Sequence, residues 1–342
     1  MQTFEKIGVL GGGAWGTALA HSACLAGRTV TLWAREEATV TSINQHHENQ
    51  TFLKGIDLHP SLTATPHLEK LSDNDALLIV VPAQFVRNVT QNLAKHINPK
   101  TPLIICAKGI ETNSSKLMSQ VIKETIPNAT IAILSGPSFA SDVAKGLPTA
   151  VTLATKDESL GQALSESLGH KALRPYWSND LIGVQIGGAV KNVLAIAAGI
   201  VVGKDLGASA HASLISRGFA ELNRFAISQG AKAKTLSGLS GLGDLVLTCS
   251  SSQSRNFSLG VALGKGTTLA DILKERTSVS EGVYTAEAVA ALAKGNAISM
   301  PISEAVAAIV KGENILPFPT VHQAENRELE PSGSGGKYHT ID

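Results

Sequence analysis

The segment KIGVL at residues 6–10 runs directly into the glycine-rich GGGAWG at 11–16 and then into the helical TALAHSACLAG. The glycines match the spacing GxGxxG, and a strand before them and a helix after them are the context that a dinucleotide-binding loop requires. We expect Gly11 to make the tight turn, Gly13 to let a pyrophosphate approach the backbone, and Gly16 to allow close packing of helix on strand. The alternative is a simple glycine-rich turn.

Short apolar runs alternate with segments of helical length through the first half of the chain. The runs are continuously apolar, as is typical of strands covered on both faces, and lie at 6–10, 29–33, 76–81, 102–107, 130–134 and 149–154. This alternation predicts a parallel sheet with helices on both faces.

After about residue 180, Ala- and Gly-rich helical segments follow one another without a convincing strand pair. They lie at 181–202, 209–229, 241–248, 256–263, 268–274, 284–294 and 301–309. We therefore expect an α/β, Rossmann-like dinucleotide-binding domain followed by an all-α domain. The expected bounds are 1–180 for the first domain, 181–330 for a helical substrate and catalytic domain, and 331–342 for a flexible Gly/Ser-rich tail.

Composition excludes several classes of partner. Hydrophobic residues make up 43% and charged residues 17% of the 342 residues, with a formal net charge of +1, which indicates a soluble globular protein. The chain has no excess of basic residues of the kind that would indicate binding to nucleic acid or to an anionic membrane.

The three cysteines Cys24, Cys106 and Cys249 are widely spaced, which predicts free thiols in a reducing compartment and indicates no metal site. The start of the chain lacks the charged-then-apolar layout of a signal peptide.

The segment 181–202 is long and apolar enough to cross a bilayer. However, Gln185, Lys191 and Asn192 stand in its middle, where polar groups are expensive in lipid. We interpret the segment as a buried core helix rather than a membrane span.

Lys191 is the one charge in the stretch GGAVKNVLAIAAGIVVG. Its neighbours on the same helix face are small: Gly187, Gly188, Ala195 and Ala198. We interpret this face as a slot with room for a ligand or another helix. A lysine desolvated in such a slot would have a lowered pKa suited to acid–base work. The alternative is a lysine whose head group reaches solvent.

Arg35 follows the second predicted strand, TVTLW, about 20 residues after the glycine loop, where NAD-binding proteins carry an acidic residue for the ribose. An arginine there favours a 2′-phosphate and hence NADP(H), or at least tolerance of it. The alternative is a solvated side chain balanced by Glu36 and Glu37.

Ligands of open parallel sheets bind beyond the carboxyl ends of the strands. Lys108 follows the run 102–107, so it is expected to project into that crevice and bind an anion. The turn SGPSFA at 135–140 follows the run 130–134 and exposes N–H groups and hydroxyls at a helix start. An ordinary turn and a solvated lysine remain the alternatives at these tips.

A second polar cluster lies at 238–260, where glycine-rich turns flank Asp244. Ser254, Arg255 and Asn256 precede a helical run and form a candidate phosphate cradle, because helix-start N–H groups and a guanidinium both bind anions. Ser254 as a helix N-cap and Arg255 as a surface charge are the alternatives.

These residues together resemble the NAD(P)-dependent glycerol-3-phosphate dehydrogenases, bacterial type. The similarity is carried, in family order over roughly residues 5–325, by GGGAWG, AKGIE, SGPSFA, GGAVKNVLAIAAGI, GLGDLVLTCSSSQSRN and SVSEGVYTA. The resemblance implies a cytoplasmic homodimer that uses NADP(H) and/or NAD(H) and serves phospholipid synthesis.

The resemblance also implies roles for individual residues. Lys191 corresponds to the general acid/base. The positions implied to contact the glycerol phosphate are Lys108, Gly136, Ser138, Lys191, Asp244, Ser254, Arg255 and Asn256. Those implied to contact the cofactor, beside the glycine loop, are Trp15, Arg35, Lys108, Ala140, Arg255, Val279 and Glu281. Ala14 departs from the family, whose bacterial members usually have Ser there, so a hydroxyl contact would be lost while a backbone N–H contact would survive.

On this basis we expect reversible reduction of dihydroxyacetone phosphate to sn-glycerol 3-phosphate. Lys191 would exchange the proton, and Asp244 would orient it and sustain its charge. A β-hydroxyacid or 6-phosphogluconate-type dehydrogenase of the same two-domain plan is one alternative. A non-catalytic NAD(P)H-sensing protein is the other.

Overall fold

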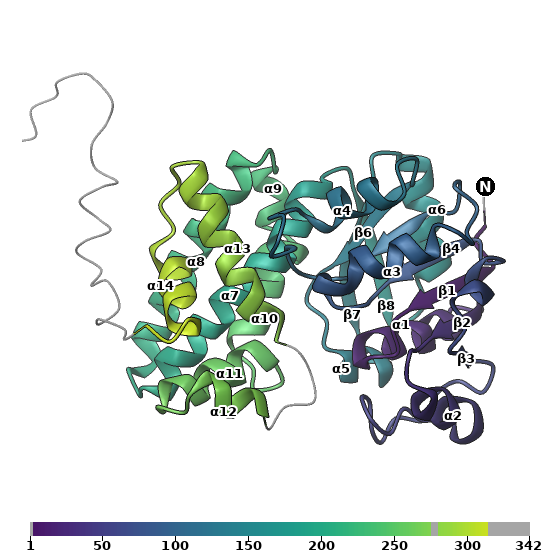
Figure 1. The fold of residues 1–342 in the computed structure, drawn as a ribbon, viewed down its shortest axis with the longest axis horizontal. Helices are drawn as coiled ribbons and strands as arrows, with labels where there is room; N and C mark the ends of the chain where they lie inside the picture. Colours follow the sequence, from purple (N-terminus) through teal and green to yellow (C-terminus); the bar gives the residue numbers. More distant parts are fainter. Residues whose placement is uncertain (1–2, 275–279, 314–342) are drawn as a thin grey trace, which may run out of the picture.

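The computed structural model describes residues 3–274 and 280–313. A sheet-containing part, purple to teal in Figure 1, lies beside an all-helical part, green to yellow. The last strand ends at Ser178 and the long helix α7 begins at Leu181. The predicted α/β part followed by an all-α part is therefore confirmed. The domain bounds at 180 and 330 stay predictions, and the tail 331–342 lies outside the described residues.

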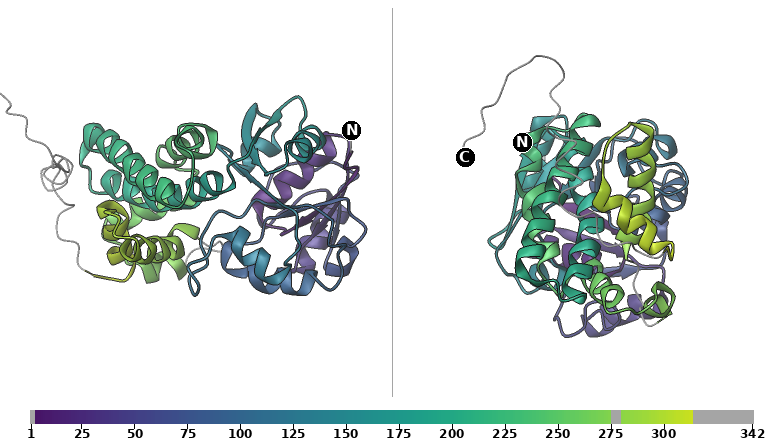
Figure 2. Two further views of the ribbon diagram at one scale, coloured as in Figure 1. Left: turned by 90° about the horizontal axis from the view of Figure 1, so that it is seen from above. Right: turned by 90° about the vertical axis from the view of Figure 1, so that its left-hand side faces the viewer.

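In the described residues the sheet has eight strands in the order β3-β2-β1-β4-β5-β6-β7-β8. Their bounds are β1 Lys6–Leu10, β2 Thr29–Trp33, β3 Thr63–Thr65, β4 Ala76–Ile79, β5 Leu103–Ile105, β6 Ile131–Ser135, β7 Thr149–Ala154 and β8 Leu173–Ser178. Helices cover both faces, as Figure 2 shows in its left view: α1 (Ala14–Leu25), α5 (Ala140–Ala144) and α6 (Glu158–Leu168) on one, and α3 (Val86–Leu93) and α4 (Met118–Thr125) on the other. The helix α2 (Glu37–His46) follows β2.

The expectation of a parallel sheet is wrong at the last two strands, β7 and β8, which run against the other six. β7 pairs with β6 in antiparallel register, with Leu134 opposite Leu153, while β8 returns to a parallel pairing with β7. The connection from β6 to β7 carries only the short α5, whereas the full helix α6 connects β7 to β8. A parallel crossover usually carries a helix long enough to return along the sheet, and the five-residue α5 is too short for that, so the chain turns back.

The helical part is built around α7 (Leu181–Gly203), which is buried along most of its length. In Figure 1 it lies among the other helices: α8 Gly207–Ser228, α9 Ala233–Leu236, α10 Asp244–Cys249, α11 Arg255–Gly264, α12 Leu269–Lys274, α13 Glu281–Gly295 and α14 Pro301–Val310, with a π-helical turn at Leu239–Gly243 before α10. Its most apolar 18-residue window has a mean hydropathy of 1.8, but 89% of that window is buried inside the protein. The interpretation of this segment as a core helix is confirmed.

The small residues of α7 bring other backbones close rather than leaving an open slot. A Cβ on Gly199 would lie 2.1 Å from the Phe257 carbonyl oxygen, and one on Gly260 would lie 2.1 Å from the Ile196 carbonyl oxygen. The glycines of α7 and α11 therefore face one another at a close helix crossing. Nearer the lysine, a Cβ on Gly187 would lie 2.4 Å from the Ser240 carbonyl oxygen.

Of the two expected occupants of this face, a ligand or another helix, the structure shows neighbouring protein segments at these small residues. Beside Gly188 the space is likewise filled, because a Cβ there would lie 2.7 Å from Ser135 Oγ. Ala195 and Ala198 are fully buried. Protein packing fills the slot because glycine allows neighbouring backbones to approach more closely than any other residue.

We expect Gly199→Ala to destabilise the protein by about 1–3 kcal/mol or more, because the added methyl would separate α7 from α11. Urea unfolding measures this. Gly295→Ala, at the end of α13 where a Cβ would meet nothing within 4 Å, is the control and should leave the free energy of unfolding unchanged or raise it by up to about 1 kcal/mol. Equal stability of the two variants would show that the crossing is not tightly packed.

Candidate active site

A buried ion pair joins α7 to α10. Lys191 Nζ lies 2.6 Å from Asp244 Oδ1 and donates to Thr248 Oγ1 at 2.7 Å. Lys191 is 6% exposed and Asp244 1% exposed, so the alternative of a lysine head group that reaches solvent is wrong. Asp244 opens α10 and Thr248 follows one turn later, which places both side chains toward α7.

The same carboxylate binds a second ammonium group. Lys108 Nζ lies 2.7 Å from Asp244 Oδ2 and 3.1 Å from the Gly136 carbonyl oxygen. One carboxylate therefore lies between two lysines, and the three charged side chains sum to one positive charge. Sequence reasoning assigned Lys108 to an anion and did not foresee its pairing with Asp244, nor the hydroxyl of Thr248. The contact with Thr248 could have been indicated only by its helical spacing from Asp244.

The pKa of Lys191 falls to about 8, from an ordinary value of 10.5. Burial is the largest cause, Asp244 opposes it, and the positive charge of Lys108 lowers the pKa further. An ammonium group with this pKa can give up and regain a proton near neutral pH, as sequence reasoning anticipated for a desolvated lysine.

The tip of β6 borders this ion cluster. Gly136 has a φ of +155°, and its carbonyl oxygen accepts hydrogen bonds from Lys108 and from Ser138 Oγ, the latter at 3.0 Å. Asn192, next to Lys191 on α7, donates to the Lys108 carbonyl oxygen at 3.2 Å. Predicted residues from β5, β6, α7 and α10 thus meet at the carboxyl ends of the strands.

The segment Ser254–Asn256 begins α11. Ser254 Oγ accepts from the Phe257 N–H at 3.2 Å, so Ser254 is the helix N-cap, as the alternative interpretation had it. Asn256 Oδ1 accepts from the Gly282 N–H at 3.1 Å. Arg255 is exposed, which agrees with the alternative of a surface charge, and desolvation lowers the pKa of its guanidinium, an effect that the carboxylate of Glu281 opposes. Direct contact of these residues with a phosphate stays a prediction.

Glu281 connects the two parts of the molecule. Its Oε1 accepts from the Ala83 N–H, just beyond β4, at 3.0 Å, and burial raises its pKa to about 7. Its Oε2 is buried without a hydrogen-bond partner among the described residues. The neighbouring predicted cofactor residue Val279 lies outside the described residues.

The glycine loop has the predicted backbone geometry. Gly11 has a φ of +124°, and a Cβ on Gly16 would lie 1.8 Å from the Gly11 carbonyl oxygen. Ala14 and Trp15 open α1, which packs against α5, where Ala140 is the first residue. Arg35, by contrast, extends into solvent. Its side chain is 75% exposed and pairs with Glu36 at 2.7 Å, which agrees with the alternative of a solvated side chain balanced by neighbouring glutamates.

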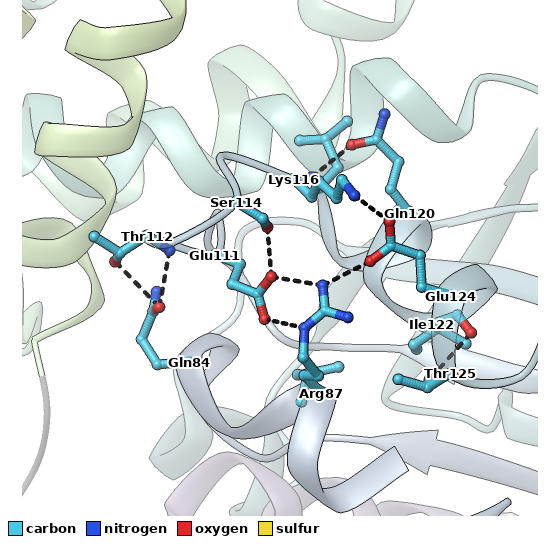
Figure 3. Close-up of polar contacts among 12 residues, drawn as sticks. Gln84, Arg87, Glu111, Thr112, Ser114, Lys116, Gln120, Ile122, Glu124 and Thr125 are labelled. Carbon is cyan, nitrogen blue, oxygen red and sulfur yellow. Dashed lines mark hydrogen bonds and ion pairs between the residues drawn. The ribbon is translucent and has the colours of Figure 1, made fainter. Parts of the chain in front are cut away.

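A polar network holds the segment that follows Lys108 (Figure 3). Gln84 accepts from the Thr112 N–H at 3.0 Å, as Figure 3 shows. It also donates to the Ile110 carbonyl oxygen at 2.8 Å. Arg87 forms a two-pronged contact with Glu111 at 2.9 and 2.8 Å and also reaches Glu124. These contacts join α3 and α4 to the loop. Sequence reasoning did not find them, because nothing in the local pattern relates residues from three separate segments.

Comparison with known proteins agrees with this arrangement. Residues 6–161 match the family model described as NAD-dependent glycerol-3-phosphate dehydrogenase N-terminus, and residues 180–316 match the model of the corresponding C-terminus. The chain belongs to the NAD-dependent glycerol-3-phosphate dehydrogenase family. The resemblance found in the sequence motifs is thereby confirmed.

Similar proteins of this family come from several bacteria. A protein of Parvibaculum lavamentivorans named glycerol-3-phosphate dehydrogenase [NAD(P)+] is 56% identical over 309 residues, which cover 90% of this chain and 93% of that protein. One of Caulobacter vibrioides with the same name is 56% identical over 311 residues, 91% and 94% of the two chains. The crystal structure of glycerol-3-phosphate dehydrogenase from Coxiella burnetii superposes with a TM-score of 0.87 at 37% identity, covering 96% of this chain and 99% of that one.

In this member of the dehydrogenase family, we expect Asp244→Asn to lower the pKa of Lys191 below its value of about 8. Burial and Lys108 would still act on the ammonium group, while the opposing carboxylate would be lost. An NMR titration of 13Cε-labelled lysine, assigned with Lys191→Met, measures this. Asp271→Asn, which removes a surface partner of Lys274 on α12, is the control. An unchanged or raised pKa in Asp244→Asn would contradict the assignment.

Proposed function

We propose that this chain catalyses the reversible, NAD(P)-dependent reduction of dihydroxyacetone phosphate to sn-glycerol 3-phosphate. The observation that carries the proposal is the buried cluster of Lys191, Asp244 and Lys108 at the carboxyl ends of the strands. The relatives' shared name supports this function and not the hydroxyacid-type or sensor alternatives. A homodimer and a cytoplasmic location stay predictions.

The glycine loop fits a dinucleotide pyrophosphate. A Cβ on Gly13 would meet nothing within 4 Å, so the loop backbone is open to a ligand at the N-terminus of α1, where free N–H groups favour anions. Trp15 lies in the first turn of the same helix, and its buried Nε1 has no hydrogen-bond partner among the described residues. The phosphates would be held by the N–H groups of Gly13, Ala14 and Trp15. Ala140 would lie on the opposite side of the phosphates. When bound, the nicotinamide supplies or accepts the hydride at its C4.

In reduction, Lys191 gives its proton to the oxygen on substrate C2 as negative charge develops there, and in oxidation it takes the proton back. Its positive charge stabilises that oxygen. Asp244 holds the lysine in place and favours its charged form, while Thr248 accepts a second of its N–H groups.

The other polar groups of the site bind and orient the substrate. Arg255 and Asn256 would bind the phosphate, together with the start of α11. Lys108, Gly136 and Ser138 would contact the three-carbon unit from the sheet side. Holding both ends of so small a molecule fixes C2 against the ring and accounts for a large part of the rate.

Steady-state kinetics with dihydroxyacetone phosphate and either NADH or NADPH tests the proposal. We expect turnover in the wild type, with a rate of reduction that falls as the pH rises through about 8, because only the protonated lysine can donate. Lys191→Ala should lower kcat by about two to four orders of magnitude and leave cofactor binding largely intact. Lys204→Ala, at the exposed C-cap of the same helix, is the control. Near-normal turnover in Lys191→Ala would contradict the mechanism.

Arg35 decides the preference between the two cofactors in this proposal. Arg35→Ala should raise the KM for NADPH about tenfold or more and change the KM for NADH little. The reason is that only NADPH carries a 2′-phosphate, which would replace Glu36 as the ion-pair partner of Arg35. Initial rates with each cofactor measure this. Arg28→Ala, at the other end of β2 and paired with Glu5, is the matched control. Equal losses with both cofactors would make Arg35 a surface residue only.

A further inference from the structure

The glycine loop is held from inside the protein by an asparagine that follows α2. Asn49 is fully buried, and its Nδ2 donates to the Gly12 carbonyl oxygen at 2.8 Å and to Thr17 Oγ1 at 2.8 Å. Its Oδ1 accepts from the Phe52 N–H at 3.1 Å. The orientation of the amide is unambiguous, because a carbonyl oxygen only accepts and a backbone N–H only donates.

The contact with Gly12 fixes a whole peptide unit. In a planar trans peptide, the carbonyl of Gly12 and the N–H of Gly13 point in opposite directions. With the carbonyl directed to the buried Asn49, the N–H of Gly13 is directed away from it. A side chain on Gly13 would meet nothing within 4 Å, so this residue stands at the open side of the loop.

Thr17 supports the same peptide. Its Oγ1 donates to the Gly12 carbonyl oxygen at 3.4 Å, a long bond, while it accepts the shorter one from Asn49. The backbone of Asn49 is itself held, because the Leu53 N–H donates to its carbonyl oxygen at 2.9 Å. The loop peptide is thus tied to a hydrogen-bonded turn as well as to its own helix.

We propose that Asn49 is a positioning residue for the cofactor: it sets the Gly12–Gly13 peptide so that the Gly13 N–H meets the pyrophosphate. This inference rests on the dinucleotide binding of the proposed function. Asparagine suits the position because one short side chain must both donate and accept. Aspartate would set a carboxylate against the Gly12 carbonyl oxygen, and glutamine is one methylene longer in a fully buried site.

Asn49→Ala tests the inference, with Asn44→Ala as the matched control. Asn44 makes the same kind of two-sided contact, but with the backbone of Ala64 in β3, at 2.9 and 2.8 Å. We expect Asn49→Ala to raise the Kd of NADH about tenfold, the usual effect of losing hydrogen bonds that orient a binding group. The Kd is measured by NADH fluorescence titration of the purified full-length chain.

The kinetic constants separate positioning from general damage. In Asn49→Ala, kcat at saturating NADH and the KM for dihydroxyacetone phosphate should stay within about twofold of wild type. In Asn44→Ala, the Kd of NADH should also stay within about twofold. An unchanged Kd in Asn49→Ala, or an equal rise in both variants, would overturn the proposal, because a purely structural role would then explain the contacts.

Thr17→Val keeps the proposal testable if Asn49→Ala does not fold. Valine preserves the volume of threonine and removes the hydroxyl that links Asn49 to the loop, so the Kd of NADH should rise about two- to fivefold. No change in that Kd would overturn the proposal. A wild type that binds NADH without reducing dihydroxyacetone phosphate would contradict the proposed function, while the binding test of Asn49 would stand.

Discussion

The Asp244 carboxylate between Lys191 and Lys108 is the interaction on which the geometry of the site depends. A lysine buried without a partner would lose its charge or destabilise the fold by several kcal/mol. Asp244 keeps the cluster charged, and it can do so only if α7, α10 and the loop after β5 meet at one point. The same contact therefore stabilises the meeting of three segments and opposes the lowering of the Lys191 pKa by burial.

Close backbone packing makes that meeting possible. Glycine in the interior of a helix lowers its stability by about 1 kcal/mol relative to alanine, yet α7 carries glycines at several positions where another backbone or side chain lies against it. Gly187 admits the turn before α10, Gly188 admits the end of β6, and Gly199 admits α11. These three contacts set where Asp244, the tip of β6 and Arg255 stand relative to Lys191.

Hydrogen bonds across the two parts of the molecule connect the sheet-containing part to the helical part. Glu281 of α13 accepts from Ala83 at the tip of β4, and Asn192 of α7 donates to the backbone of Lys108. Gln185, also on α7, accepts from the Ser119 N–H of α4 at 2.9 Å. These three hydrogen bonds fix the helical part against the strand tips of the sheet.

The sequence by itself determined the features that local patterns carry. The apolar runs gave the bounds of β1, β2 and β7, the start of α7, and the positions of Lys191 and Asp244 along the chain. Local patterns did not reveal β3 and β8, because edge strands alternate buried and exposed residues, and β8 contains a proline and an arginine.

Only the tertiary structure decided the reversed direction of β7, the second lysine on Asp244, the filling of the small-residue face of α7, and the hold of Asn49 on the glycine loop. Each of these is a contact between residues far apart in the sequence. Periodicity reports only which face of an element is buried, and it contains no information about which distant group lies against that face.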